Sequence, residues 1–83
     1  MSTQTTETLS RQVVELVSSH MDIPMEQISL DSQFAADLGF DSLDLMEFVM
    51  AVEDKFDISV PDKESDTIVT VRDAVRAIEK LIS

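Results

Sequence analysis

The sequence predicts an all-α fold, a small four-helix bundle with three main helices, a short third helix and a long loop between the first two. Glycine and proline are nearly absent, with one Gly and two Pro in 83 residues, and so few helix breakers favour helices. Apolar residues recur at helical spacing in three stretches. The length allows one modest core, so we expect a single domain over residues 1–83.

The first helix is predicted over about residues 6–19, after a disordered tail at 1–5. Thr5 or Thr6 is the candidate N-cap. The buried face of this helix is predicted from four apolar residues at i, i+4, i+7 and i+8, namely Leu9, Val13, Leu16 and Val17.

A long loop follows Pro24. Loops of this length inside compact domains are uncommon and often functional. We expect its apolar side chains to hold it against the bundle; these are Ile28, Leu30, Phe34 and Leu38.

The second helix is predicted over residues 42–56, followed by an extended link to Pro61, because the residue before a proline disfavours helix. A short helix or helical turn is expected from there to about residue 67. The last helix begins after Thr70, where Thr70-x-x-Asp73 resembles a capping box. Its predicted core face carries Val71, Val75, Ile78 and Ile82.

Two apolar stripes run along the second predicted helix. The first is a core stripe within roughly 100° of arc, made of Leu45, Phe48, Val49, Val52 and Phe56. The second is made of Leu43, Met46 and Met50 and is bordered by Asp44, Glu47, Glu53 and Asp54. This second stripe either packs under the preceding loop or forms a docking surface. The acidic border favours docking, because an apolar centre with a charged rim is typical of transient interfaces, and methionine adapts to several partners.

The net charge is −11, from 17 acidic against six basic residues. This charge excludes nucleic acids and anionic membrane surfaces as partners and predicts partners with basic patches. Acidity can also serve solubility alone, but residues 37–66 hold ten of the acids and only two of the bases. This concentration of charge argues against solubility as its sole role.

The chain has no cysteine, no secretory signal and no apolar run long enough to span a membrane, so a cytoplasmic protein is expected. We also expect a monomer.

Ser42 begins the second predicted helix, directly after Asp41. Gly39 allows a sharp turn and leaves room near the serine, and Asp41 can cap the helix. A phosphate ester on Ser42 would be stabilised by the helix N-terminus, although Asp41-Ser42 alone also fits an ordinary helix start.

A serine hydrolase is disfavoured, because His20 is the only histidine, no nucleophile elbow is present and carboxylates surround the serine. No catalytic or metal-binding residues are predicted, since the aspartates do not match a calcium loop.

The run D-L-G-F-D-S-L-D-L-M-E-F-V-M-A-V-E-D-K-F, residues 37–56, resembles the acyl carrier protein family. The resemblance continues in I-S-V-P-D and T-V-R-D-A-V and spans about residues 9–82. It implies that a phosphopantetheinyl transferase moves 4′-phosphopantetheine from coenzyme A onto Ser42. The thiol of that arm would hold acyl groups as thioesters, so the protein would be a carrier for fatty-acid or related biosynthesis and not an enzyme.

The resemblance also implies residue roles. Docking of acyl-transferring and synthase enzymes with basic patches is carried over to Asp41, Leu43, Asp44, Met46, Glu47, Met50, Glu53 and Asp54. An acyl pocket is carried over to Val52, Phe56, Val60 and Ile68. Lys63 places a base where family members are often acidic, and Arg72 and Arg76 make the last helix less acidic than the middle of the chain. These departures leave a specialised polyketide or aminoacyl pathway open. A further alternative is an acidic helical interaction module that is never modified. We expect a free-standing carrier, although a domain of a larger synthase would look the same.

Overall fold

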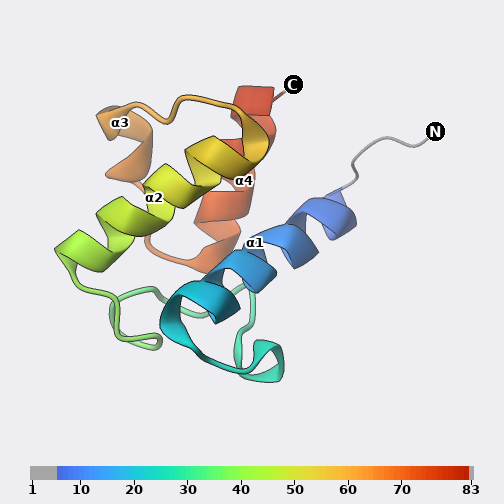
Figure 1. Cartoon of the computed structure of the whole chain (residues 1–83), viewed down its shortest axis with the longest axis vertical. Helices are drawn as coiled ribbons and strands as arrows, with labels where there is room; N and C mark the ends of the chain where they lie inside the picture. The colour runs from blue at the N-terminus through green and yellow to red at the C-terminus, as the bar shows by residue number, and fades with distance from the viewer. Residues whose placement is uncertain (1–5, 83) are drawn as a thin grey trace.

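Four α-helices and a short 3₁₀ helix form the fold in the computed structural model, which describes residues 6–82 (Figure 1). The elements are α1 (Thr6–Met21), η1 (Met25–Gln27), α2 (Ser42–Phe56), α3 (Asp62–Ser65) and α4 (Val71–Ile82). The prediction of an all-α bundle with three main helices and one short helix is confirmed. The predicted tail at 1–5, the cap at Thr5 and the side chain of Thr6 lie outside the described residues.

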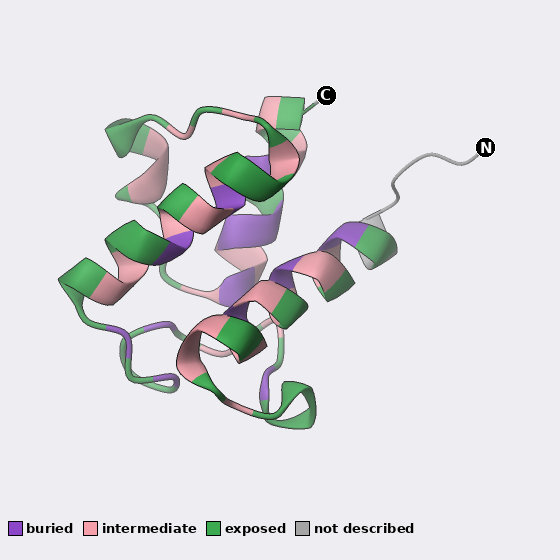
Figure 2. Ribbon diagram, in the orientation of Figure 1, coloured by how far each residue is buried: buried purple, intermediate pink, exposed green. Residues whose placement is uncertain are grey.

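The hydrophobic core lies between α1, α2 and α4, whose buried stripes face one another (Figure 2). Its members on these helices are Leu9, Val13 and Val17 of α1, Phe48 and Val52 of α2, and Val71, Ala74, Val75 and Ile78 of α4. The prediction for Ile82 is wrong, because this residue lies in the last turn of α4, at the edge of the bundle, and is 38% exposed.

The loop between α1 and α2 is fastened to the start of α4 by backbone hydrogen bonds. The amide of Phe34 donates to the carbonyl of Val69 (2.9 Å), and the amide of Val71 donates to the carbonyl of Ser32 (3.0 Å). The second bond satisfies one of the free amides at the start of a helix. The predicted burial of the loop's apolar residues is confirmed for Ile28, Phe34 and Leu38, and Leu30 is half-buried.

Helices α1 and α2 end in the same way. Asp22 and Asp57 adopt left-handed backbone conformations with φ of 57° and 56°. In each case the amide of the next residue donates to the carbonyl five residues earlier, from Ile23 to Ser18 and from Ile58 to Glu53, both at 3.1 Å. This is the Schellman pattern, and aspartate is one of the few residues that tolerate the left-handed region.

The capping box predicted at the start of α4 is present. The amide of Asp73 donates to the hydroxyl oxygen of Thr70 (3.2 Å), and the amide of Thr70 donates to Oδ2 of Asp73 (3.0 Å). Oδ2 also accepts the amide of Val69 at 3.0 Å. These two backbone bonds lower the pKa of Asp73, because they stabilise its charged form.

None of the helices within residues 6–82 combines the length and the apolar character that crossing a membrane requires.

Candidate functional site

The start of α2 is closed by a reciprocal capping box that leaves Ser42 exposed. The amide of Asp44 donates to Oδ1 of Asp41 (2.8 Å), and the amide of Asp41 donates to Oδ2 of Asp44 (3.2 Å). Ser42 is the first residue of the helix, and its hydroxyl makes no hydrogen bond to any residue in the described part of the chain. The neighbouring aspartates therefore do the capping, and the serine hydroxyl remains free to react.

Gly39 turns the chain toward this helix start with φ of 79°, a conformation that glycine adopts without penalty. A Cβ built on Gly39 would meet no heavy atom within 4 Å. Backbone conformation, and not the predicted need for room near the serine, therefore explains the glycine.

Aromatic rings support the segment that leads into Ser42. Phe40, two residues before the serine, is 5% exposed and packs edge-on against Phe34 and Phe48, with ring centroids 4.9 and 5.8 Å apart. His20, in the last turn of α1, stacks on Phe40 with ring centroids 5.7 Å apart and planes 16° from parallel. Packed aromatic rings therefore hold in place the segment that precedes the serine. Sequence analysis missed this role of Phe40, because ring contacts across the loop depend on the tertiary fold.

The second apolar stripe of α2 is open to solvent. Leu43, Met46 and Met50 are 59%, 59% and 61% exposed, and Figure 2 shows that exposed residues recur along α2. The alternative that they pack under the preceding loop is therefore wrong. Most of the predicted acidic border is exposed as well, at Asp41, Glu47 and Asp54. The apolar centre and acidic rim together form what we call the α2 face, defined by Asp41, Leu43, Asp44, Met46, Glu47, Met50 and Asp54.

Glu53 differs from the other predicted docking acids. It is half-buried, and its Oε2 accepts the amide hydrogen of Val60 at 2.8 Å. Its carboxylate is therefore directed toward the link after α2 and is partly withdrawn from the α2 face.

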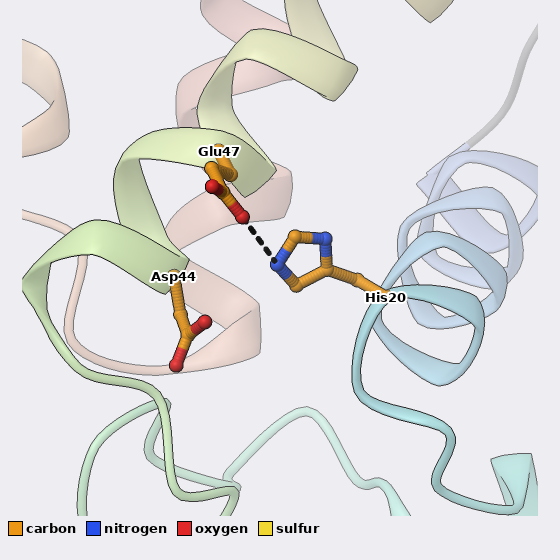
Figure 3. A group of neighbouring side chains, drawn as sticks. All are labelled: His20, Asp44 and Glu47. Carbon is orange, nitrogen blue, oxygen red and sulfur yellow. Dashed lines mark ion pairs between the residues drawn. The ribbon is translucent and has the colours of Figure 1, made fainter.

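His20 points from α1 toward the carboxylates of Asp44 and Glu47 on α2 (Figure 3). Its Nε2 lies 4.0 Å from Oε1 of Glu47, and one ligand atom from each of the three residues lies within 4.8 Å of the others. One oxygen of Asp44 already accepts an amide in the capping box, and Glu47 is largely exposed. Exposed pairs at this separation contribute little to stability. That the chain has no metal site stays a prediction.

Two open grooves meet at Ser42. The α2–α3 groove, with a volume of about 410 Å³, is lined by α2 from Ser42 to Glu53 and by Val60, Asp62, Ser65 and Asp66. The loop groove, of about 440 Å³, lies on the other side of the serine and is lined by Gln33, Phe34, Ala35, Phe40, Asp41, Ser42, Leu45, Ile68 and Val69. Leu45 belongs to both grooves and separates them. The sequence pattern predicted Leu45 and Val49 as core residues only, although Val49 lies at the edge of the core stripe nearest the exposed one.

A small internal void lies behind the α2–α3 groove. Its volume is about 10 Å³, roughly that of one water-sized probe. Val52, Val60 and Ile68 of the predicted acyl pocket line it, whereas Phe56 does not and packs against the core nearby. Val49 and Val60 line both the groove and the void, so they form the wall between them.

Comparison with known proteins identifies the family. Residues 11–78 match the family model described as "Phosphopantetheine attachment site". The acyl carrier protein of Sulfurovum sp. (strain NBC37-1) is 45% identical over 69 residues, covering 83% of this chain and 92% of the relative. Acyl carrier proteins of Sinorhizobium fredii and Prochlorococcus marinus are 43% and 44% identical, over 87% and 88% of this chain and 92% and 91% of their own lengths.

The helical bundle and the matched family model define a carrier domain with covalently attached 4′-phosphopantetheine. The chain belongs to the acyl carrier protein family. Members of this family are carriers and not enzymes, and they interact with synthase and transferase enzymes. The family predicted from the run around Ser42, together with its cofactor, is confirmed.

Proposed function

We propose that Ser42 is the attachment residue of the 4′-phosphopantetheine arm and that the protein delivers acyl groups to the enzymes of fatty-acid biosynthesis. The observation that carries this proposal is the position of the serine. It is an exposed first residue of α2, with a free hydroxyl, at the point where two grooves meet.

The surroundings of Ser42 fit a phosphodiester. The positive end of the α2 dipole stabilises the negative charge of a phosphate at this position, and the exposed hydroxyl is accessible to a transferase. When attached, the arm supplies the terminal thiol that holds an acyl group, which the chain itself lacks because it has no cysteine.

The α2 face is the proposed docking surface for the transferase and for the acyl-transferring and synthase enzymes. Its exposed apolar centre, Leu43, Met46 and Met50, provides area to bury on contact. The acidic rim and the net charge of −11 favour partners with basic patches, because opposite fields accelerate encounter.

The α2–α3 groove is the proposed entrance for the acyl chain. It begins at Ser42 and ends at the wall formed by Val49 and Val60, behind which Val52 and Ile68 line the internal void. Because that void holds about 10 Å³, an acyl chain can enter only if this wall moves. Phe56 packs against the core and is proposed to belong to the same acyl pocket.

Fatty-acid biosynthesis is favoured by the names of the relatives, which are given simply as acyl carrier proteins. A specialised polyketide or aminoacyl pathway would use the same site with other partner enzymes. An unmodified interaction module would use the α2 face alone.

Intact-protein mass spectrometry tests the attachment site. The chain is incubated with coenzyme A, Mg²⁺ and a broad-specificity phosphopantetheinyl transferase, beside the variants Ser42→Ala and Ser59→Ala. We expect the parent and Ser59→Ala, which removes another exposed serine, to gain one phosphopantetheinyl group, and Ser42→Ala to gain none. A gain in Ser42→Ala would refute the site, and no gain in the parent with several transferases would favour the unmodified module.

A further inference from the structure

We propose that Glu53 is a positioning residue that holds one wall of the α2–α3 groove in place through the backbone of Val60. The inference rests on the proposed role of this groove as the entrance for the acyl chain. Glu53 was predicted as a docking residue, and the proposed role is to position the backbone of Val60.

Glu53 accepts hydrogen bonds from several backbone amides of the link that follows α2. Its carbonyl oxygen accepts the amides of Asp57 and Ile58, the latter at 3.1 Å, and its Oε2 accepts the amide of Val60 at 2.8 Å. A hydrogen bond to an ionised acceptor is shorter and stronger than a neutral one. One residue of α2 therefore fixes three amides of a four-residue segment, and the last of them depends on the side chain.

The position of Val60 matters for the groove. Its side chain lines both the α2–α3 groove and the internal void. Val60 also precedes Pro61, which is the N-cap of α3 and has no amide hydrogen of its own to donate. The bond from the Val60 amide is therefore the last anchor to α2 before the four-residue helix begins.

The opposite side of α3 is fastened separately. Nζ of Lys80 on α4 lies 2.9 Å from Oε2 of Glu64 on α3. Lys80 therefore holds α3 to α4, while Glu53 holds to α2 the link that leads into α3. Loss of the Glu53 bond should release Val60 and leave the contact between α3 and α4 in place.

Glu47 provides a matched comparison on the same helix. Its side chain is 56% exposed, and within the described residues it pairs with Nε2 of His20 at 4.0 Å. Removing Glu47 deletes one negative charge from α2 without touching the link at 57–60. Any effect that is specific to Glu53 therefore reports the hydrogen bond and not the charge.

Amide hydrogen exchange of Val60, measured by NMR on the unmodified protein, is the first test. We expect Glu53→Ala to accelerate exchange at Val60 by about tenfold or more, because the amide loses its acceptor. Glu53→Asp keeps the charge but shortens the side chain, so it should accelerate exchange similarly, whereas Glu53→Gln keeps an acceptor of the right length and should remain close to the parent. Glu47→Ala should leave Val60 unchanged. Parent-like exchange in both Glu53→Ala and Glu53→Asp would overturn the proposal.

The second test uses the protein loaded with an octanoyl thioester and follows cleavage by hydroxylamine. If Glu53 holds the wall that shelters the chain, Glu53→Ala should be cleaved several-fold faster than the parent, and Glu53→Gln should restore protection. Equal cleavage rates in the parent and Glu53→Ala would refute the sheltering role. If Ser42 proved not to carry the arm, no loaded protein would form, while the Val60 measurement would still decide the role of the carboxylate, so the two failures are distinguishable.

Discussion

Helices α2 and α4 use their apolar residues in opposite ways. Helix α4 has 12 residues and buries five of them, all apolar, against the rest of the bundle. Helix α2 has 15 residues but fully buries only Phe48 and Val52, while three large apolar side chains on its outer side are more than half exposed. Folding alone explains the pattern of α4, because one buried stripe is what a bundle helix needs.

The difference supports the proposal that α2 carries the function. Leu43, Met46 and Met50 add nothing to the core of this structure, and exposing them to water carries a cost for solubility. The same helix begins with the free hydroxyl of Ser42 and carries four acidic residues against one basic residue. A second, unburied apolar stripe beside an exposed serine supports the proposal that α2 meets partner proteins, whereas the buried residues of α4 stabilise the fold.

The largest expected effect separates the two sides of α2. Phe48 is 1% exposed and packs against Phe34 and Phe40, so Phe48→Ala should lower the free energy of unfolding by about 3–5 kcal/mol. Met46→Ala, on the outer side at 59% exposure, should change it by less than about 0.5 kcal/mol. Urea denaturation followed by circular dichroism measures both. Similar losses in the two variants would contradict the division of α2 into a core side and a partner side.

A smaller effect is expected at the start of α2. Asp41→Ala removes the acceptor for the amide of Asp44 and should lower the free energy of unfolding by about 1 kcal/mol. Asp41→Asn keeps a good cap and should lie much closer to the parent. If both variants lost the same stability, the charge of Asp41 and not its capping bond would be the cause.

The capping box that Thr70 and Asp73 form at the start of α4 should make the free energy of unfolding depend on pH. The amides of Thr70 and Val69 lower the pKa of Asp73 in the folded protein, so its contribution is present above the unfolded-state pKa of about 3.9 and is lost as the pH falls through the folded-state pKa. The stability advantage of the parent over Asp73→Asn should therefore be constant near neutral pH and shrink below about pH 4. Urea midpoints at several pH values measure it, and an advantage that grew on acidification would be inconsistent with this sign.

Much of this fold could be predicted because it follows local rules. The bounds of α2 and the capping residues at Asp41, Thr70 and Asp73 depend on short sequence patterns, and the structure reproduces them. The left-handed helix ends were missed, although both follow a common local pattern of an apolar residue, aspartate and isoleucine, at 21–23 and 56–58. That repeated pattern is a signal that could have predicted them.

Features that join distant parts of the chain could not be predicted from local patterns. The pairing of Gln33 with Thr70, the stacking of His20 on Phe40 and the bond from Val60 to Glu53 each depend on where the helices lie in space. The exposure of the stripe at Leu43, Met46 and Met50 also depends on which element covers α2. For the site, the sequence therefore predicted the serine and its acidic surroundings, while the separation of Glu53 from the other acids required the structure.

The smallest expected effect concerns the acidic rim of the α2 face. Glu47 is largely exposed and holds no backbone amide, so Glu47→Lys should leave the stability nearly unchanged. The reversed charge should repel a basic partner and slow modification by a phosphopantetheinyl transferase several-fold at low salt. Because the interaction is screened over roughly 10 Å at 0.1 M salt, the difference from the parent should shrink as salt is added. Initial rates at several salt concentrations test this, with Arg76→Glu on α4, an exposed charge reversal away from the α2 face, as the control. Equal slowing in both variants would mean that overall charge, and not the α2 face, governs the encounter.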